Sequence, residues 1–415
     1  MQEWIKQTNI YEVNLRQYTP EGTIKAFAGH LPRLRDMGVE TLWFMPITPI
    51  AQKNRKGTMG SYYACSDFTS VAAEFGTLDD FRSLVQQAHS MGFKVILDWV
   101  ANHTGWDHWW TTAHPDWYEK DGQTGDFKKA SGMDDIIELD FKNSALRQAM
   151  IEAMAFWVRE ADIDGFRSDL AFWVELDFWQ EAKPVLENIK PLFWLGELDS
   201  LDNPEYMQVY DAAYTWRWMH KAEQFYKSHA SFGDLLHVLH EYQHVAGLKA
   251  WFTANHDENS WNGTEYEKYG DMAKLLAVFS CTWPGIPLLY SGQELPNHKR
   301  LQFFEKDAIE WLPQCELHSF YRALFQLKKK NAALATDAAL EIISADEGQR
   351  VLAFRRKKEE SEVLVWLNFS GEYKTVVPNA DERFQLVDVS FNATNTIFSS
   401  GELQLQPWGF SVFAK

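Results

Sequence analysis

The sequence predicts an α/β fold, a (β/α)8 TIM barrel with a short insertion after strand 3 and a C-terminal antiparallel β-domain. Short apolar runs alternate with stretches of helical periodicity, which is typical of parallel strands buried on both faces. Eight such runs precede residue 335, and eight β-α units favour a closed barrel. A doubly wound open sheet is the alternative, but no G-x-G-x-x-G follows the first strand.

The strands are expected in chain order, with helices predicted over 23–38, 77–92 and 143–160 among the segments that separate them. The predicted strands are residues 10–18, 40–47, 93–100, 163–169, 193–199, 209–216, 249–257 and 285–294.

Four segments follow from this pattern. Residues 1–103 and 142–334 form the two parts of the barrel domain, and 104–141 is a short loop-rich inserted domain. From 335 to 415 the sequence alternates apolar and polar residues between turn signals, which predicts a small all-β domain.

Composition excludes several classes of protein. The formal net charge of −18 repels phosphate backbones and anionic lipid, so nucleic-acid and membrane-surface partners are not expected. No apolar run reaches the roughly 20 residues that span a bilayer, and no signal peptide is present as given, so we expect a cytoplasmic protein. The three cysteines lack metal-ligand spacing and are interpreted as reduced thiols in or near the core.

Polar residues collect where the predicted strands end, which in a β/α barrel is the face that carries the chemistry. Each polar group follows an apolar run, and this recurs at four corresponding places in the repeat. The residues are Asp98, Asn102 and His103 at the third strand, Arg167 and Asp169 at the fourth, Glu197 at the fifth, and His256 and Asp257 at the seventh.

Converging carboxyl groups with an arginine and two histidines suggest cleavage of glycosidic bonds, which needs one ionised and one protonated carboxyl group. Arg167 should favour the charged form of Asp169, as expected for a nucleophile. Glu197 follows the apolar run "FWLG", which should disfavour its charge and suit a proton donor. Asp257 could oppose the positive charge that develops on the sugar ring, and His103 could donate to a sugar hydroxyl.

Four motifs make the chain resemble the α-amylase family, glycoside hydrolase family 13. They are "DWVANH" (98–103), "GFRSD" (165–169), "GE" (196–197) and "NHD" (255–257), in the order of that family's signature regions. "GSYYACSDF" (60–68), "PGIPLLYSGQE" (284–294) and "PWGFSVF" (407–413) extend the resemblance over nearly the whole chain.

The resemblance implies a retaining glycosidase that hydrolyses α-glucosidic bonds of starch, glycogen or maltooligosaccharides through a covalent glycosyl-enzyme. Asp169 would be the nucleophile, Glu197 the general acid/base and Asp257 the stabiliser of the transition state. The residues that would shape the sugar site are Tyr63, Asp98, His103, Arg167 and His256.

The resemblance also raises the question of calcium, for which Asn102 is the candidate ligand and Glu138 a second. The loop "QYTPEGTIKAF" (17–27) has no ligand cluster, and Phe172-Trp173 stands where relatives often carry lysine and histidine. Hard cations need several oxygen ligands, so we expect no required cofactor and interpret Asn102 as a structural amide.

Three alternatives remain open from the sequence. A transglycosylase would use the same residues with a sugar as acceptor, and a non-catalytic carbohydrate-binding relative would keep the fold. A metal-dependent hydrolase would use Asp98, His103, His256 and Asp257 as ligands, although the positive charge of Arg167 would oppose the binding of a divalent cation there.

Tryptophans in the insertion offer a further hypothesis. One or two of these rings could form platforms for sugar, although packing is the competing interpretation for each. The rings are Trp106, Trp109, Trp110 and Trp117.

Overall fold

A computed structural model of the protein describes residues 2–377, 385–387 and 402–415. Eight parallel strands close into a barrel in the order β1-β10-β9-β8-β7-β6-β3-β2, which confirms the predicted fold class. All eight predicted strands are present; β7 has the predicted bounds, and the other seven are shorter than expected. They are β1 (Ile10–Val13), β2 (Thr41–Phe44), β3 (Lys94–Trp99), β6 (Gly165–Ser168), β7 (Phe193–Asp199), β8 (Ala212–Tyr214), β9 (Leu248–Trp251) and β10 (Ile286–Tyr290).

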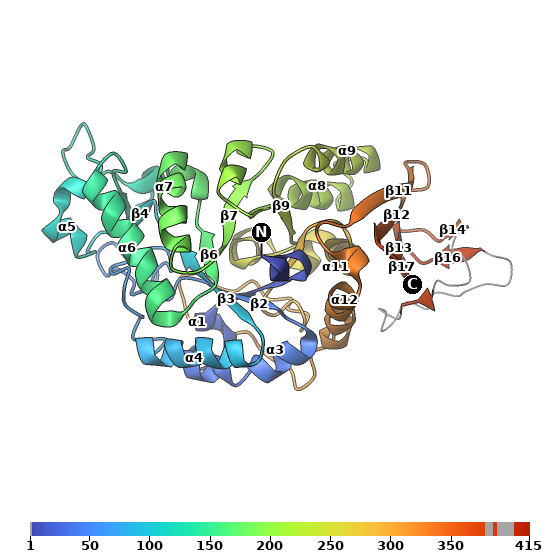
Figure 1. Cartoon of the computed structure of the whole chain (residues 1–415), viewed down its shortest axis with the longest axis horizontal. Coiled ribbons are helices and arrows are strands. Elements are labelled where there is room, and N and C mark those ends of the chain that lie inside the picture. The colour runs from blue at the N-terminus through green and yellow to red at the C-terminus, as the bar shows by residue number, and fades with distance from the viewer. Residues whose placement is uncertain (1, 378–384, 388–401) are drawn as a thin grey trace.

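Helices surround this barrel (Figure 1). Between β7 and β8 the connection contains a single turn of 3₁₀ helix, Pro204–Gln208, where the sequence suggested a helix. The α-helices of the barrel are α1 (Leu15–Tyr18), α2 (Ile24–Ala28), α3 (Leu31–Met37), α4 (Leu78–Ser90), α6 (Ser144–Ala161), α7 (Leu176–Glu187), α8 (Trp216–Tyr226), α9 (Phe232–Gln243), α10 (Glu265–Tyr269), α11 (Ala273–Thr282) and α12 (His318–Lys330).

Local sequence fixes several helix ends. Thr77 caps α4 and Ser231 caps α9, each in a capping box with the aspartate three residues later. The strands are almost wholly buried apolar residues, because the helices cover their outer face and side chains fill the barrel. This rigid frame fixes where the strand ends point.

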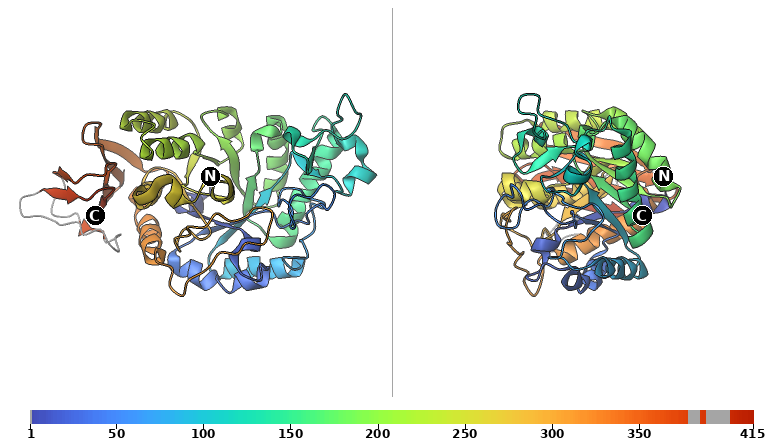
Figure 2. Two further views of the ribbon diagram at one scale, coloured as in Figure 1. Left: turned by 180° about the vertical axis from the view of Figure 1, so that it is seen from behind. Right: turned by 90° about the vertical axis from the view of Figure 1, so that its left-hand side faces the viewer.

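The insertion and the C-terminal domain lie at opposite ends of the molecule (Figures 1 and 2). The insertion contains the antiparallel pair β4 (His103–Gly105) and β5 (Ile136–Glu138) and the short helix α5 (Trp110–Ala113).

Antiparallel strands form the C-terminal domain. A five-stranded sheet has the order β11-β12-β13-β17-β15, and β14 pairs with β16. Residues 378–384 and 388–401 of the predicted β-domain lie outside the described residues. The strands are β11 (Ala339–Asp346), β12 (Val351–Lys358), β13 (Ser361–Asn368), β14 (Lys374–Val376), β15 (Gln385–Leu386), β16 (Leu403–Leu405) and β17 (Phe410–Ala414).

A buried arginine ties this domain to the barrel. Arg356 of β12 is fully buried and donates to the backbone carbonyls of Thr282 at 2.8 Å and Ala335 at 2.7 Å.

In the described part of the chain, no helix is both long and apolar enough to cross a bilayer. The cytoplasmic location stays a prediction.

Gly165 provides a test of barrel packing. A Cβ at this position would lie 2.1 Å from the backbone oxygen of Phe193 on the neighbouring strand, so the strands would have to separate. We expect Gly165→Ala to destabilise the fold by about 1–3 kcal/mol, measured as a lower midpoint of thermal unfolding. Gly122→Ala is the control, because its Cβ would point into open space. Equal midpoints for the two variants would contradict the packing described here.

Candidate active site

The barrel strands bring the predicted polar residues to one mouth of the barrel. Asp98 on β3 lies directly beside Arg167 on β6 in the strand register, so the two side chains point the same way. Glu197 lies within β7 and not after it, and Asp169 follows β6 with its N–H bonded to the carbonyl of Trp99 at 2.9 Å.

Arg167 is the centre of this group. Its side chain is fully buried, and Nη1 donates to Asp98 Oδ1 at 2.8 Å and to Asp169 Oδ1 at 3.0 Å. Nη2 lies 2.8 Å from Glu197 Oε2, a charge contact without hydrogen-bond alignment. One guanidinium therefore holds the carboxyl groups of Asp169 and Glu197 side by side.

A cavity of about 530 Å³ opens onto these groups. Asp169, Glu197 and Asp257 all line it, together with Tyr63 and His103. Asp98 and Arg167 are not among the lining residues; Arg167 contacts Asp169 and Glu197, and Asp98 contacts Arg167. The three acids thus face one space, as a single-site reaction requires.

Tyr63 lines the cavity and contacts His256, which lies outside the lining. The Tyr63 hydroxyl lies 2.7 Å from His256 Nε2 and donates to Asp98 Oδ2 at 3.2 Å, and the two rings stack with centroids 5.4 Å apart. His256 Nε2 also lies 3.3 Å from Asp257 Oδ2. Its other nitrogen, Nδ1, lies 2.5 Å from Glu12 Oε1.

Glu12 is a site residue that the sequence analysis missed. Its side chain is fully buried on β1 and holds His256 in place. A glutamate inside the apolar run "IYEV" was the available signal, because a buried carboxyl group needs a charged or hydrogen-bonding partner.

The acidities of the two central carboxyl groups differ. Burial, opposed by the charge of Arg167, raises the pKa of Glu197 to about 7. Burial also raises the pKa of Asp169 to about 6. The sequence analysis expected Arg167 to dominate at Asp169, and this is corrected: the arginine lowers the pKa, but loss of water and the nearby Asp98 outweigh it.

His256 and Asp257 stabilise each other's charge. Burial alone would lower the pKa of His256, but Asp257 and Glu12 hold it well above its ordinary value. Burial would raise the pKa of Asp257, but the charge of His256 and its hydrogen bond keep it below the usual range. Asp257 is therefore ionised at neutral pH, and its side chain is 38% exposed.

His103 stays neutral. Burial lowers its pKa to about 4, and among the described residues its Nε2 has no hydrogen-bond partner. Because His103 lines the cavity, this nitrogen is available to a bound hydroxyl group.

Leu170, which lines the cavity next to Asp169, has a left-handed backbone with φ 38° and ψ 52°. A branched residue pays a conformational cost there. The turn directs the Leu170 N–H to Glu197 Oε2 at 2.8 Å, so the backbone after Asp169 also positions Glu197.

The suggested calcium ligands are engaged otherwise. The carboxylate of Glu138 pairs with Lys128 at 2.8 Å, and the Asn102 amide nitrogen lies 3.5 Å from His103 Nδ1. Across residues 2–377, 385–387 and 402–415, no cluster of three or more histidine, cysteine or acidic side chains is arranged to hold a metal. The expectation that no calcium is required stays a prediction.

The four insertion tryptophans are not among the residues that line the cavity, and the platform hypothesis stays a prediction. Trp110 and Trp117 are buried against each other with centroids 5.0 Å apart. Trp106 donates to the backbone of Asp134, and the exposed Trp109 lines a different hollow beside α6. The aromatic rings of the cavity are instead Tyr63, Trp261, Phe303 and Phe304.

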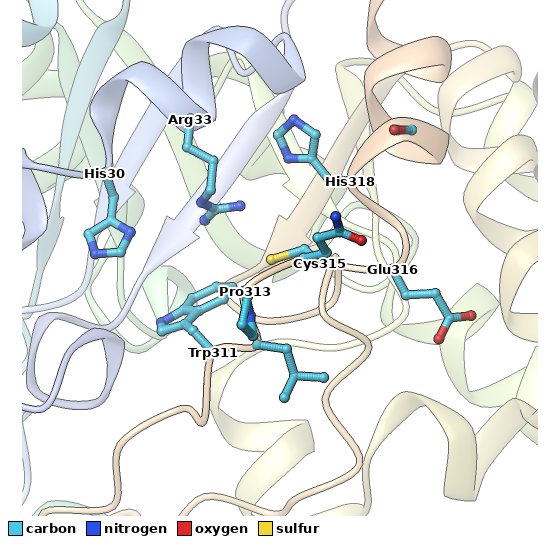
Figure 3. A pocket seen from close by; sticks show the side chains of 10 residues that line it. His30, Arg33, Trp311, Pro313, Cys315, Glu316 and His318 are labelled. Atoms are coloured by element: carbon cyan, nitrogen blue, oxygen red, sulfur yellow. The ribbon is translucent and has the colours of Figure 1, made fainter.

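Another cavity, of about 720 Å³, lies between α3 and the start of α12 (Figure 3). It contains Arg33, Cys315 and Glu316, and the Glu316 carboxylate points away from Arg33. It shares no residue with the predicted site, so its size alone does not make it the centre of chemistry.

A parallel (β/α)8 barrel with carboxyl groups of unequal acidity on one cavity at its mouth defines an enzyme of the glycosidase class. Comparison with known proteins identifies the family. The model of the alpha-amylase catalytic domain matches residues 6–129 and 113–395, and the chain belongs to this family of glycoside hydrolases.

Relatives extend over most of the chain. The alpha-amylase MalA of Haloarcula japonica is 28% identical over 401 residues, which cover 90% of this chain and 57% of that protein. The maltogenic alpha-amylase of Bacillus acidopullulyticus is 25% identical over 464 residues, covering 99% and 78%. The chain thus spans little more than half of the first relative.

Solved structures match the fold. An alpha-amylase from Lactobacillus plantarum superposes with a TM-score of 0.88 at 24% identity, covering all of both chains. The maltogenic alpha-amylase AmyB from Thermotoga neapolitana has a TM-score of 0.84 at 26% identity, covering 99% of this chain and 97% of that one.

Proposed function

We propose that the protein is a retaining glycosidase that hydrolyses α-glucosidic bonds of starch-, glycogen- or maltooligosaccharide-type glucans. One observation carries this proposal: the carboxyl groups of Asp169 and Glu197 contact the same guanidinium and face one cavity with Asp257. The family supports the reaction class. The names of relatives, alpha-amylase, maltogenic alpha-amylase and cyclomaltodextrinase, support an α-glucan substrate.

The first step assigns distinct roles to the two acids. Glu197, with the higher pKa, gives its proton to the glycosidic oxygen while a carboxylate oxygen of Asp169 attacks C1. The bond from C1 to the leaving oxygen breaks, and a covalent glycosyl-enzyme forms. Asp257, held ionised by His256, opposes the positive charge on the ring.

The second step regenerates the enzyme. The Glu197 carboxylate takes a proton from water, the water oxygen bonds to C1 from the side that the leaving group vacated, and the bond to Asp169 breaks. Two inversions give net retention. Tyr63 and His103 would contact the sugar, while Arg167 and Asp98 position the acids from below.

Replacing the two acids tests these roles. Asp169→Asn should lower kcat on maltoheptaose by roughly four orders of magnitude or more, because no nucleophile remains. Glu197→Gln should lower it by about 10²–10⁴-fold through loss of the proton donor. Asp134→Asn, an exposed acid outside the cavity, is the control. Product chromatography measures the rates, and substantial hydrolysis by Asp169→Asn would refute the nucleophile assignment.

The pKa values predict a narrow pH profile. Asp169 must be ionised, so kcat/KM should rise with pH through about 6, and the pKa of Asp98, also about 6, adds to that limb. Glu197 must be protonated, so kcat/KM should fall through about 7. The optimum then lies between these values. Initial rates from pH 4 to 9 test this, and a falling limb that persists in Glu197→Gln would contradict the assignment.

We also propose that the reaction needs no calcium, since Glu138 is paired with Lys128. Exhaustive chelation should leave the rate on maltoheptaose unchanged. Added calcium should not raise the midpoint of thermal unfolding, because only an ion that binds the folded state stabilises it. A loss of activity that calcium restores would overturn this expectation.

A further inference from the structure

The loop between β2 and α4, residues 45–77, fastens the insertion to the barrel mouth. The N–H groups of Gln52 and Lys53 both donate to Asp107 Oδ2, at 2.9 and 3.1 Å. A small apolar cluster lies between the two segments and includes Ile50, Ala51 and Ile136. The loop and the insertion are therefore packed and hydrogen-bonded to each other.

The same loop is pressed against the loop that follows β10. The Thr58 N–H donates to Glu305 Oε1 at 3.0 Å, and the Met59 N–H donates to the Phe304 carbonyl at 2.9 Å. Gly57 has φ 60°, and a Cβ there would lie 2.6 Å from Phe304 Cβ. Only glycine allows so close an approach in this conformation.

Lys56 reaches across the junction of these segments. Its Nζ lies 2.7 Å from Asp135 Oδ1 of the insertion and 5.9 Å from the centre of the Phe304 ring. The Asp135 side chain is only 6% exposed, so this is a half-buried ion pair, and all three residues line the catalytic cavity. A sugar chain cannot pass between two groups in direct contact.

The contact of Lys56 with Asp135 and Phe304 forms a barrier, and the order of the strands shows on which side of the cavity it lies. β2 and β10 are the two neighbours of β1, and β7 is four strands away from β1 in either direction. Glu197 on β7 therefore stands on the far side of the barrel mouth from the loops that carry Lys56 and Phe304. A general acid lies on the side of the leaving group, so the barrier lies on the side of the sugar that stays bound.

We propose that Lys56, Asp135 and Phe304 form an end wall that limits the bound non-reducing end to one or a few glucosyl units. The enzyme would then act from the non-reducing ends of its substrate and not within the chain. The volume of about 530 Å³ is that of a small-molecule site and suits a short stretch of glucan. Leu170, after β6, lines the cavity on the Glu197 side, since β6 neighbours β7.

Maltoheptaose labelled at its reducing end tests this inference, which rests on the proposed function. The first labelled products should be only slightly shorter than the substrate. A second maltoheptaose, whose non-reducing glucose carries a bulky chemical cap, should be cleaved at least tenfold more slowly in kcat/KM. In the double variant Lys56→Ala/Asp135→Ala, the ratio of kcat/KM for uncapped to capped maltoheptaose should fall toward one. Labelled products of many lengths should then appear.

Two further variants make the result specific. Asp135→Asn keeps the shape of the side chain but loses the charge, and it should shift the ratio in the same direction. It provides the test if the double variant does not fold. Lys129→Ala/Asp134→Ala removes a neighbouring exposed ion pair outside the cavity and should leave the ratio unchanged. Equal cleavage of the two substrates by the parent enzyme, or a ratio unmoved in the wall variants, would overturn the inference. Failure to cleave any glucan would overturn the proposed function itself.

Discussion

The buried charge balance around Arg167 is the constraint on which the site depends. Two cations lie among five carboxyl groups, four of them largely buried, so these carboxyl groups cannot all ionise without a large cost in free energy. At Glu197 the loss of water outweighs the charge of Arg167, which contacts it without hydrogen-bond alignment, and its pKa rises to about 7. The cations are Arg167 and His256, and the acids are Glu12, Asp98, Asp169, Glu197 and Asp257.

Barrel geometry makes this crowding possible. Alternate residues of a strand share a face, so Arg167 and Asp169 follow one another toward the cavity while Ser168 is turned away. Neighbouring strands in register then add Asp98 and Glu197 beside them. The hydrogen bonds between neighbouring strands fix the backbone of Asp98 and Arg167, so the buried cation is held at a defined position among the acids.

The sequence predicted the barrel and the acids because both leave local signals. Alternating strands and helices have periodicities that can be read directly, and the acids follow apolar runs such as "FWLG". The direction of each pKa shift is harder to predict from sequence. At Asp169 one visible neighbour, Arg167, argued for a low value, whereas burial depends on the whole fold and outweighs it.

Residues of the loops escaped prediction for a different reason. The sequence offered tryptophans of the insertion as sugar platforms, but apart from the predicted Tyr63 the rings that line the cavity come from the segments after β9 and β10, Trp261 and Phe303 among them. Lys56 and Asp135 are almost 80 residues apart, and neither stands in a motif. Their contact depends on how three long segments pack, which no local pattern encodes.

The acids are fixed on barrel strands, whereas Lys56, Asp135 and Phe304 lie on loops, and this difference affects which properties of the enzyme can change by substitution. The groups proposed for bond cleavage are locked by strand register and a shared arginine, so substitution there would disturb charge balance across the whole site. The wall of the cavity is instead held by an ion pair, a glycine contact and a few backbone hydrogen bonds at the surface of the barrel mouth. The length of the bound sugar can therefore vary by changes in these loops while the chemistry beneath them stays the same.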